Sequence, residues 1–264
     1  MISISPLAFV HPEAQIGKSV IIEPFATVYA NVRIGDNCII SPNVVIHEGT
    51  IIGNNCKIHT GAVIGSIPQD LKFVGEDSVV EIGDNVIIRE FATINRGTAY
   101  SQKTIIEENV LIMAYVHIAH DCIIRKNAIL SNAVNVAGHV EIGEYAVLGG
   151  LCGVHQFSKI GKHAMIAAGT IIRKDVPPYV LAGREPIAFF GVNRRGLKRR
   201  GFSNEELELI QNIYRILYLS KLNNTQAIEH INATIEDCEI KRDIVDFILS
   251  SQRGIIRCAN SIHR

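Results

Sequence analysis

An aliphatic residue recurs at every sixth position over most of the first 172 residues, beginning at Val10 and ending at Ile172. The recurrence is interrupted after Ile64 and again after Ile94, but the length of each interruption is a multiple of six, so the register survives. A period of six matches neither the 3.6-residue turn of an α-helix nor the alternation of a plain strand. It indicates short strands joined by turns.

Each six-residue unit also carries a small or β-branched residue four places after its aliphatic one, as at Ala14, Ala26 and Cys38. We expect the large side chains to point inwards and the small residue to let the chain turn a corner. Gly, Asn and Asp, as in IGDN, supply the positive φ of such corners. Three units close a coil of 18 residues, and stacked coils pair through parallel hydrogen bonds about 4.8 Å apart. The sequence therefore predicts a mainly β protein, a parallel β-helix.

Composition excludes several classes of protein. Lys plus Arg and Asp plus Glu both number 26, so no overall charge favours nucleic acid or a membrane surface. No apolar run approaches the roughly 18 residues that span a bilayer, and the N-terminus lacks the features of a signal peptide. The six cysteines form no CxxC pair, which favours reduced thiols and a cytoplasmic protein without stable membrane insertion. Four of them occupy the small corner position: Cys38, Cys56, Cys122 and Cys152.

The register stops at Pro177-Pro178, and the periodicity becomes helical from about residue 203. Ser203 and Glu206 have the spacing of a capping box, and two further amphipathic segments follow near 225–236 and 240–252. We expect a β-helix domain over residues 1–190 and a small α-helical domain over 191–264. The helical domain would cover the open end of the β-helix, where strand edges are otherwise unpaired.

A basic cluster joins the two expected domains. It comprises Arg194, Arg195, Lys198, Arg199 and Arg200. A solvated basic turn is one interpretation. Because the rest of the chain is neutral, the cluster better fits a site for phosphates or for an acidic protein partner.

Four of the 10 histidines fall in one stretch, at His117, His120, His139 and His155. Residues 18 apart lie directly above one another on such a coil, which stacks His120 with Gly138 and Gln156, and Asp121 with His139. Histidine is the natural general base near neutral pH, and Asp121 is placed to orient the imidazole of His120. We expect Gly138 to leave room for a substrate and to offer its backbone N–H to an oxyanion. Solvated or packed histidines are the alternative.

The first interruption, GSIPQDLKFVGEDSVVE, is a loop that carries Gln69, Asp70 and Lys72. Long departures from a regular repeat are often functional, although a tolerated surface insertion is the alternative. The second interruption, around Ala99 to Thr104, is polar and less informative.

The chain resembles the bacterial UDP-N-acetylglucosamine 3-O-acyltransferases, which begin lipid A synthesis. The resemblance rests on HIAHD, QDLKF, GHVEIG, GGLCGVHQF, KDVPPYV and GLKRRGFS, and it runs from about residue 10 to 205. It implies a left-handed β-helix and a homotrimer with clefts between neighbouring copies. It also implies direct transfer, without an acyl-enzyme, of a 3-hydroxyacyl chain from acyl carrier protein to the glucosamine 3-hydroxyl. Neither a metal nor a cofactor is implied beyond the carrier's own phosphopantetheine.

The resemblance also assigns roles to individual residues. His120 becomes the general base, Asp121 its partner and Gly138 the oxyanion donor. Substrate contacts are implied for Gln69, Asp70, Lys72, His117, His139, His155 and Gln156. The nucleotide and phosphate region is implied for Asn193, Arg199 and Arg200, and the basic cluster is implied to help dock the carrier protein. Ala168 stands at the floor of the acyl pocket, and Arg195 replaces an acidic residue that some members have near the uridine.

Three other classes of protein fit the sequence less well. The later N-acyltransferases of the same pathway carry a uridine-binding domain before their repeats, whereas here the repeats begin by residue 10. Enzymes of the γ-carbonic anhydrase type need zinc-binding histidines with four intervening residues, whereas HIAH has two. A structural or ice-binding β-helix would show a ladder of identical residues on one face, and no such ladder is present.

Overall fold

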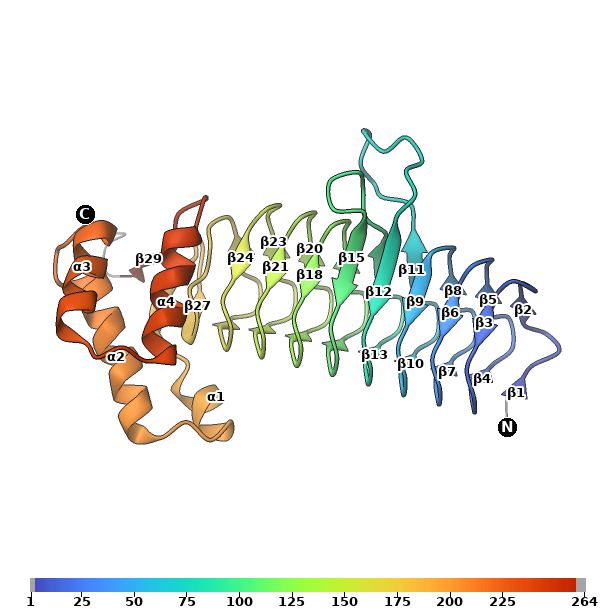
Figure 1. Ribbon diagram of the computed structural model, residues 1–264, viewed down its shortest axis with the longest axis horizontal. Helices are drawn as coiled ribbons and strands as arrows, with labels where there is room; N and C mark the ends of the chain where they lie inside the picture. Colours follow the sequence, from blue (N-terminus) through green and yellow to red (C-terminus); the bar gives the residue numbers. More distant parts are fainter. Residues whose placement is uncertain (1–2, 260–264) are drawn as a thin grey trace.

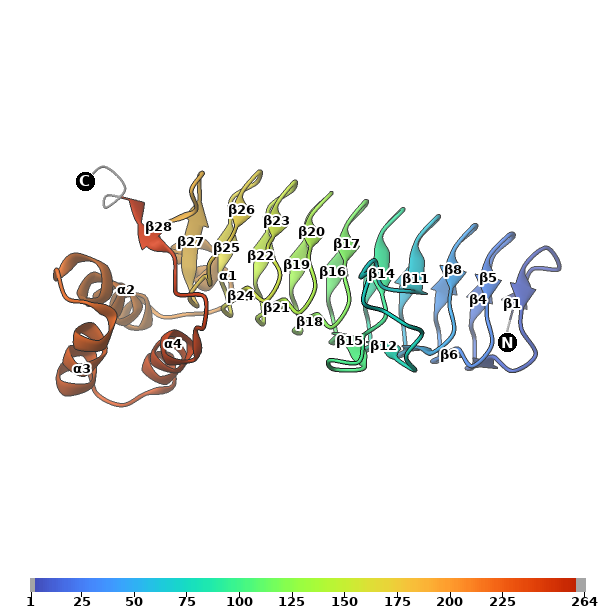
Figure 2. The same cartoon turned by 90° about the horizontal axis from the view of Figure 1, so that it is seen from above.

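The computed structural model describes residues 3–259, and most of them form a three-sided prism of stacked coils (Figures 1 and 2). Sheet A comprises β1 (Ser3–Ile4), β4 (Ile21–Ile22), β7 (Ile39–Ile40), β10 (Lys57–Ile58), β13 (Ile87–Ile88), β16 (Leu111–Ile112), β19 (Ile129–Leu130), β22 (Val147–Leu148), β25 (Met165–Ile166), β27 (Val180–Gly183), β28 (Ala188–Val192) and β29 (Arg257–Cys258). Sheet B comprises β2 (Phe9–Val10), β5 (Thr27–Val28), β8 (Val45–Ile46), β11 (Val63–Ser66), β14 (Thr93–Asn95), β17 (His117–Ile118), β20 (Asn135–Val136), β23 (Gly153–Val154) and β26 (Ile171–Ile172). Sheet C comprises β3 (Gln15–Ile16), β6 (Arg33–Ile34), β9 (Thr50–Ile52), β12 (Val79–Ile82), β15 (Lys103–Ile106), β18 (Ile123–Ile124), β21 (Glu141–Ile142) and β24 (Lys159–Ile160).

The strands pair in the register that the period of six predicts. Along the regular coils each strand bonds in parallel to the strand 18 residues later, as where Ile118 pairs with Val136. The recurring aliphatic residues form one continuous buried core inside the prism. The predicted fold is confirmed: the chain is a left-handed parallel β-helix followed by helices.

The chain turns at three kinds of corner, which we name by the sheets that they join: A–B, B–C and C–A. From β3 to β26, a residue with positive φ lies at each regular corner, commonly asparagine, as at Asn37 (φ 59°) and Asn127 (φ 59°). The small residue after it is buried, which explains the four corner cysteines. Burial raises the pKa of the Cys122 thiol to about 12, and this thiol donates to the carbonyl of Ala137 at 3.1 Å. These thiols are packing groups.

Both interruptions of the repeat are loops that leave the prism at the B–C corner (Figure 1). The longer loop spans residues 67–78, between β11 and β12, and the shorter spans 96–102, between β14 and β15. Arg96, which begins the shorter loop, is anchored on the preceding coils, since its guanidinium donates to the carbonyls of Gly65 at 2.9 Å and Glu48 at 2.8 Å. Ser78 donates to the carbonyl of Gly97 at 2.7 Å. The two loops therefore share one anchored base.

The tail contains α1 (Arg194–Arg199), α2 (Asn204–Leu219), α3 (Asn224–Thr234) and α4 (Glu239–Ser250). The predicted capping box is confirmed, because Ser203 accepts from the Glu206 amide while the Glu206 carboxylate accepts from the Ser203 amide. The basic cluster differs from a plain turn: most of it lies on α1, which Asn193 caps. Within residues 3–259, no helix has both the length and the apolar character needed to span a bilayer.

The helices lie at the C-terminal end of the prism (Figures 1 and 2). The hexapeptide register does stop at Pro177-Pro178, yet β27 still adds to sheet A beside β25. Lys162 bonds to Asp243 of α4 at 2.6 Å, and the hydroxyl of Tyr214 in α2 donates to the Pro178 carbonyl at 2.6 Å. The tail covers the end of the β-helix, as expected.

Candidate active site

The predicted histidine cluster assembles at the B–C corner, in the coils that follow β17 and β20. Asp121 (φ 59°) and His139 (φ 61°) hold the same left-handed corner position in adjacent coils, and the His139 amide donates to the His120 carbonyl at 3.0 Å. The predicted stacking at 18-residue spacing is confirmed. It brings His120, Asp121, Gly138 and His139 to one point on the prism.

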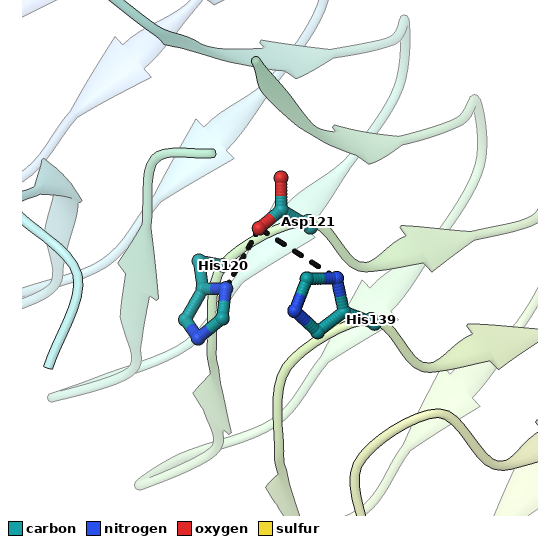
Figure 3. A group of neighbouring side chains, drawn as sticks. All are labelled: His120, Asp121 and His139. Carbon is teal, nitrogen blue, oxygen red and sulfur yellow. Dashed lines mark hydrogen bonds and ion pairs between the residues drawn. The ribbon is translucent and has the colours of Figure 1, made fainter. Parts of the chain in front are cut away.

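The imidazole of His120 is held by Asp121 (Figure 3). Nδ1 of His120 lies 2.7 Å from Oδ2 of Asp121. An ionised carboxylate only accepts hydrogen bonds, so Nδ1 carries a proton, and in the neutral imidazole Nε2 is then the nitrogen with the lone pair. The Asp121 side chain is 0% exposed and that of His120 is 13% exposed. The pair is thus a buried carboxylate orienting an imidazole whose other nitrogen is free to accept a proton.

Asp121 is itself held by residues that the sequence reasoning missed. Its carboxylate accepts from the amide and hydroxyl of Thr98, at 3.1 and 2.7 Å, and from the amide and hydroxyl of Ser101, at 3.2 and 2.5 Å. Burial alone raises the pKa of Asp121, but the bonds from Ser101, Thr98 and His120 outweigh it and hold the pKa below its ordinary value. The loop of residues 96–102, whose sequence was less informative, therefore keeps the carboxylate of Asp121 ionised.

Gly138 lies directly beneath the His120 ring. A Cβ atom at Gly138 would stand 2.5 Å from Cε1 and 2.7 Å from Nε2 of His120. The missing side chain thus makes room for the imidazole, which corrects the expectation that it makes room for substrate. No acceptor within residues 3–259 is bonded to the Gly138 N–H, so this N–H is available to an oxyanion.

His139 completes the cluster from the next coil. Its ring stacks on Phe157 at 4.2 Å and meets the edge of His120 at 4.9 Å and that of Tyr100 at 4.5 Å. Its Nδ1 is buried, lies 3.8 Å from Oδ2 of Asp121, and has no hydrogen-bond partner within the described part of the chain. Burial lowers the pKa of His139, although the charges of Asp121 and, more weakly, Asp70 oppose this. His139 is therefore held mainly by ring packing.

Within residues 3–259, His120, Asp121 and His139 form a group that could hold a metal ion, since they offer ligand atoms within 4.8 Å of one another. Nδ1 of His120 already donates to Asp121, and Thr98 and Ser101 donate to the same carboxylate. A metal would have to replace several of these bonds. The donor set fits an imidazole base better than a metal centre.

His117 and His155 lie beside this cluster and line a shallow groove of about 420 Å³ on sheet B, which Gly153 also lines. Nδ1 of His117 is hydrogen-bonded to the Thr93 hydroxyl at 2.8 Å. Burial lowers the pKa of His117, and the neighbouring His120 adds to this effect. Gln156 is exposed at the same corner. The structure thus brings these three predicted contacts close to His120.

Gln69, Asp70 and Lys72 lie in the longer loop, which rises from the same corner. Gln69 and Lys72 are exposed, and the Lys72 amide donates to the Asp70 carboxylate at 3.0 Å. The side chains of Leu71 and Val74 in this loop are almost wholly exposed. The three predicted contacts therefore lie on a loop that packs against little of its own chain.

Two groups of predicted residues lie elsewhere. Asn193 and Arg200 lie at the C–A corner, where Asn193 donates to the His163 carbonyl at 2.9 Å and the Arg200 guanidinium lies 5.1 Å over the Tyr145 ring. Within residues 3–259 no carboxylate pairs with Arg200. Arg199 is exposed on the last turn of α1. Ala168 is exposed at the A–B corner.

Comparison with known proteins gives consistent matches. A family model described as bacterial transferase hexapeptide (six repeats) matches residues 13–48 and 103–138, and one described as UDP-N-acetylglucosamine O-acyltransferase, domain 2, matches residues 175–256. The acyl-[acyl-carrier-protein]–UDP-N-acetylglucosamine O-acyltransferase of Trichlorobacter lovleyi is 51% identical over 259 residues, which are 97% of this chain and 99% of the relative. That of Aquifex aeolicus is 57% identical over 198 residues, 75% of this chain and 76% of the relative.

Solved structures agree. The UDP-N-acetylglucosamine acyltransferase of Bacteroides fragilis superposes with a TM-score of 0.95 at 51% identity, over 96% of this chain and 100% of that one. The Arabidopsis enzyme superposes with a TM-score of 0.83 at 31% identity, over 96% and 100%. The fold and the histidine corner therefore define a hexapeptide-repeat acyltransferase. Within that class, the chain belongs to the acyl-[acyl-carrier-protein]–UDP-N-acetylglucosamine O-acyltransferase family.

Proposed function

We propose that this enzyme transfers an acyl chain, 3-hydroxylated in its natural donor, from acyl carrier protein to the 3-hydroxyl of UDP-N-acetylglucosamine, the first step of lipid A synthesis. The observation that carries the proposal is the pairing of a free Nε2 on His120 with the Gly138 N–H beside it. A base and an oxyanion donor at one point are what direct attack on a thioester requires. The names of the relatives supply the two substrates.

The reaction follows from this geometry. Nε2 of His120 takes the proton of the sugar hydroxyl as the hydroxyl oxygen attacks the thioester carbonyl. The Gly138 N–H stabilises the oxyanion of the tetrahedral intermediate. When the intermediate collapses, the carbon–sulfur bond breaks and the phosphopantetheine thiol leaves with the proton from His120, while Asp121 stabilises the imidazolium in between. Neither a metal nor a cofactor of the enzyme's own takes part.

The remaining predicted residues are proposed to bind the substrates around this point. His117, His155 and Gln156 border the groove on sheet B, while Gln69, Asp70 and Lys72 approach from the loop above the corner. Asn193, Arg199 and Arg200 are proposed to bind the nucleotide and its phosphates, because Arg200 is a half-buried cation without a carboxylate partner. The other cations of α1 are proposed to dock the acidic carrier protein. Buried free thiols favour a cytoplasmic location.

A homotrimer is proposed because a single chain leaves the site incomplete. His120 and Ala168 lie at the B–C and A–B corners of the prism, and Arg200, after α1, packs over Tyr145 at the C–A corner. The A–B corner also carries bulky residues with positive φ and half or more of the side chain exposed, namely Phe25, Phe91, Tyr115 and Leu151. Bulky side chains in this conformation are costly, and contact with a neighbouring copy would offset the cost. Neighbouring copies would then contribute different corners to each cleft.

Mixing two inactive variants tests the shared site. His120→Ala and Arg200→Ala remove residues from different corners, so in a mixed trimer some clefts receive an intact corner from each chain. Purified mixed trimers should recover about a third of wild-type turnover, because one of the three clefts in such a ring receives both intact residues from adjacent chains. The measurement is turnover of purified mixed trimers carrying two different tags. No recovery in such trimers would contradict a site shared between copies.

Donor length tests both the substrate and the role of Ala168. A panel of acyl carrier proteins with chains of different length is assayed with UDP-N-acetylglucosamine, and the product masses are measured. We expect a product whose mass corresponds to one acyl chain on the sugar nucleotide, and we expect Ala168→Met to shift the preferred donor to a shorter chain by filling the pocket floor. An unchanged length profile would remove Ala168 from the acyl pocket, and the absence of any acylated sugar would refute the proposed reaction.

A further inference from the structure

We propose that Thr98 and Ser101 are positioning residues, which fix the carboxylate of Asp121 so that one of its oxygens is reserved for His120. This inference rests on the proposed function, in which His120 is the base. The loop of residues 96–102 belongs to neither the hexapeptide register nor the residues assigned above. Its two hydroxyl side chains nevertheless converge on the one fully buried carboxylate of the site.

The hydrogen bonds divide unequally between the two carboxylate oxygens. Oδ1 accepts from the amide of Thr98 and from the amide and hydroxyl of Ser101. Oδ2 accepts from the Thr98 hydroxyl and from Nδ1 of His120, both at 2.7 Å. Each carboxylate oxygen has about two lone-pair directions. The loop therefore saturates Oδ1 and leaves one place on Oδ2, which His120 occupies.

The directions of the two hydroxyl hydrogens are also set. The Thr98 hydroxyl accepts from the Tyr100 amide at 3.2 Å, so its own hydrogen is left to point at Oδ2 of Asp121. The Ser101 hydroxyl has two acceptors in reach, Asp121 Oδ1 at 2.5 Å and the Lys103 carbonyl at 3.0 Å. The single hydrogen favours the nearer, charged acceptor. Both hydroxyls thus act as donors to the carboxylate.

The Thr98 hydroxyl competes with a second donor, His139, for Oδ2 of Asp121. Nδ1 of His139 is buried, has no hydrogen-bond partner among residues 3–259, and lies 3.8 Å from the same Oδ2. If Oδ2 were open, His139 would be the nearest donor to fill it, and Asp121 would then divide its charge between two imidazoles. By occupying that place, Thr98 keeps Asp121 paired with His120 alone.

The test removes each hydroxyl while keeping the shape of the loop. Thr98→Val and Ser101→Ala each delete one donor, Thr98→Ser restores the hydroxyl, and Ser78→Ala deletes a buried hydroxyl that supports the same loop through Gly97 but does not touch Asp121. We expect Thr98→Val and Ser101→Ala each to lower kcat roughly tenfold, as for loss of a hydrogen bond to a charged group. KM for UDP-N-acetylglucosamine should stay within about twofold in both. Thr98→Ser and Ser78→Ala should stay near wild type.

A spectroscopic reading on the intact trimer makes the test independent of turnover. The Nδ1 proton of His120, bonded to a buried carboxylate, should give a low-field proton NMR signal that disappears in His120→Ala. We expect this signal to broaden or shift in Thr98→Val and Ser101→Ala and to remain in Ser78→Ala. An unchanged signal in Thr98→Val would overturn the positioning role, as would an equal change in Ser78→Ala. A changed signal with undiminished turnover would instead leave the positioning role standing and refute His120 as the base.

Discussion

Replacing His120 by alanine is expected to abolish acyl transfer. The substitution removes the only proposed proton acceptor while leaving the Gly138 N–H in place, so we expect turnover to fall roughly a thousandfold, within the range measured for general bases. The stability of the fold should not change, because the imidazole lies outside the aliphatic core and packs against Gly138 and His139 at the corner. The measurements are turnover and the thermal unfolding temperature of the trimer.

His59 provides a matched control. Its imidazole also lies on the outside of the prism and faces a carboxylate, with Nδ1 3.6 Å from Glu90, but it lies at the A–B corner, two coils before His120. His59→Ala should therefore keep wild-type turnover. A His120→Ala enzyme with normal turnover would show that the proton is removed by another group.

Adding one methyl group at Gly138 is expected to reduce turnover roughly a hundredfold, since small misplacements of a catalytic group have effects of this size. The methyl would stand 2.5 Å from Cε1 of His120, so the ring can make room for it only by giving up its hydrogen bond to Asp121. The φ of Gly138 is not positive, so the backbone tolerates alanine and the loss comes from displacement of His120. The backbone N–H stays in place.

Gly150→Ala is the control for this substitution. Its added methyl would stand 3.2 Å from the Asn132 carbonyl and meets no histidine. We expect Gly150→Ala to retain activity, and a crystal structure of Gly138→Ala to show the His120 ring turned away from Asp121. Full activity in Gly138→Ala, with the ring unmoved, would mean that the steric account is wrong.

The sequence specified the fold because a side-chain period of six has few structural solutions. It also specified the heart of the site, because residues 18 apart become neighbours in adjacent coils, as His120 and Gly138 do. The same spacing could have placed Thr104 at the site. It precedes Cys122 by 18 residues, and its hydroxyl accepts from the Asp121 amide at 2.9 Å. Contacts between residues 18 apart can therefore be predicted from the sequence wherever the coil is regular.

The rule fails where the chain leaves the coil. Thr98 and Ser101 belong to a loop with no periodicity, so only the folded structure shows that their hydroxyls contact Asp121. The role of Gly138 was also misjudged, because an absent side chain does not reveal which neighbour fills the space. The helix α1 was missed because a six-residue segment that contains Gly196 shows little helical periodicity. Its N-cap residue Asn193 was the available signal.

A crystal structure of the enzyme with UDP-N-acetylglucosamine bound would test the proposed chemistry most directly. The distance to measure is the one between Nε2 of His120 and the oxygen of the sugar 3-hydroxyl. We expect a hydrogen bond of about 3 Å. The lone pair of that oxygen that would attack the thioester should point toward the space beside the Gly138 N–H. A 3-hydroxyl bound out of reach of His120, or closer to another titratable side chain, would contradict direct attack driven by this imidazole.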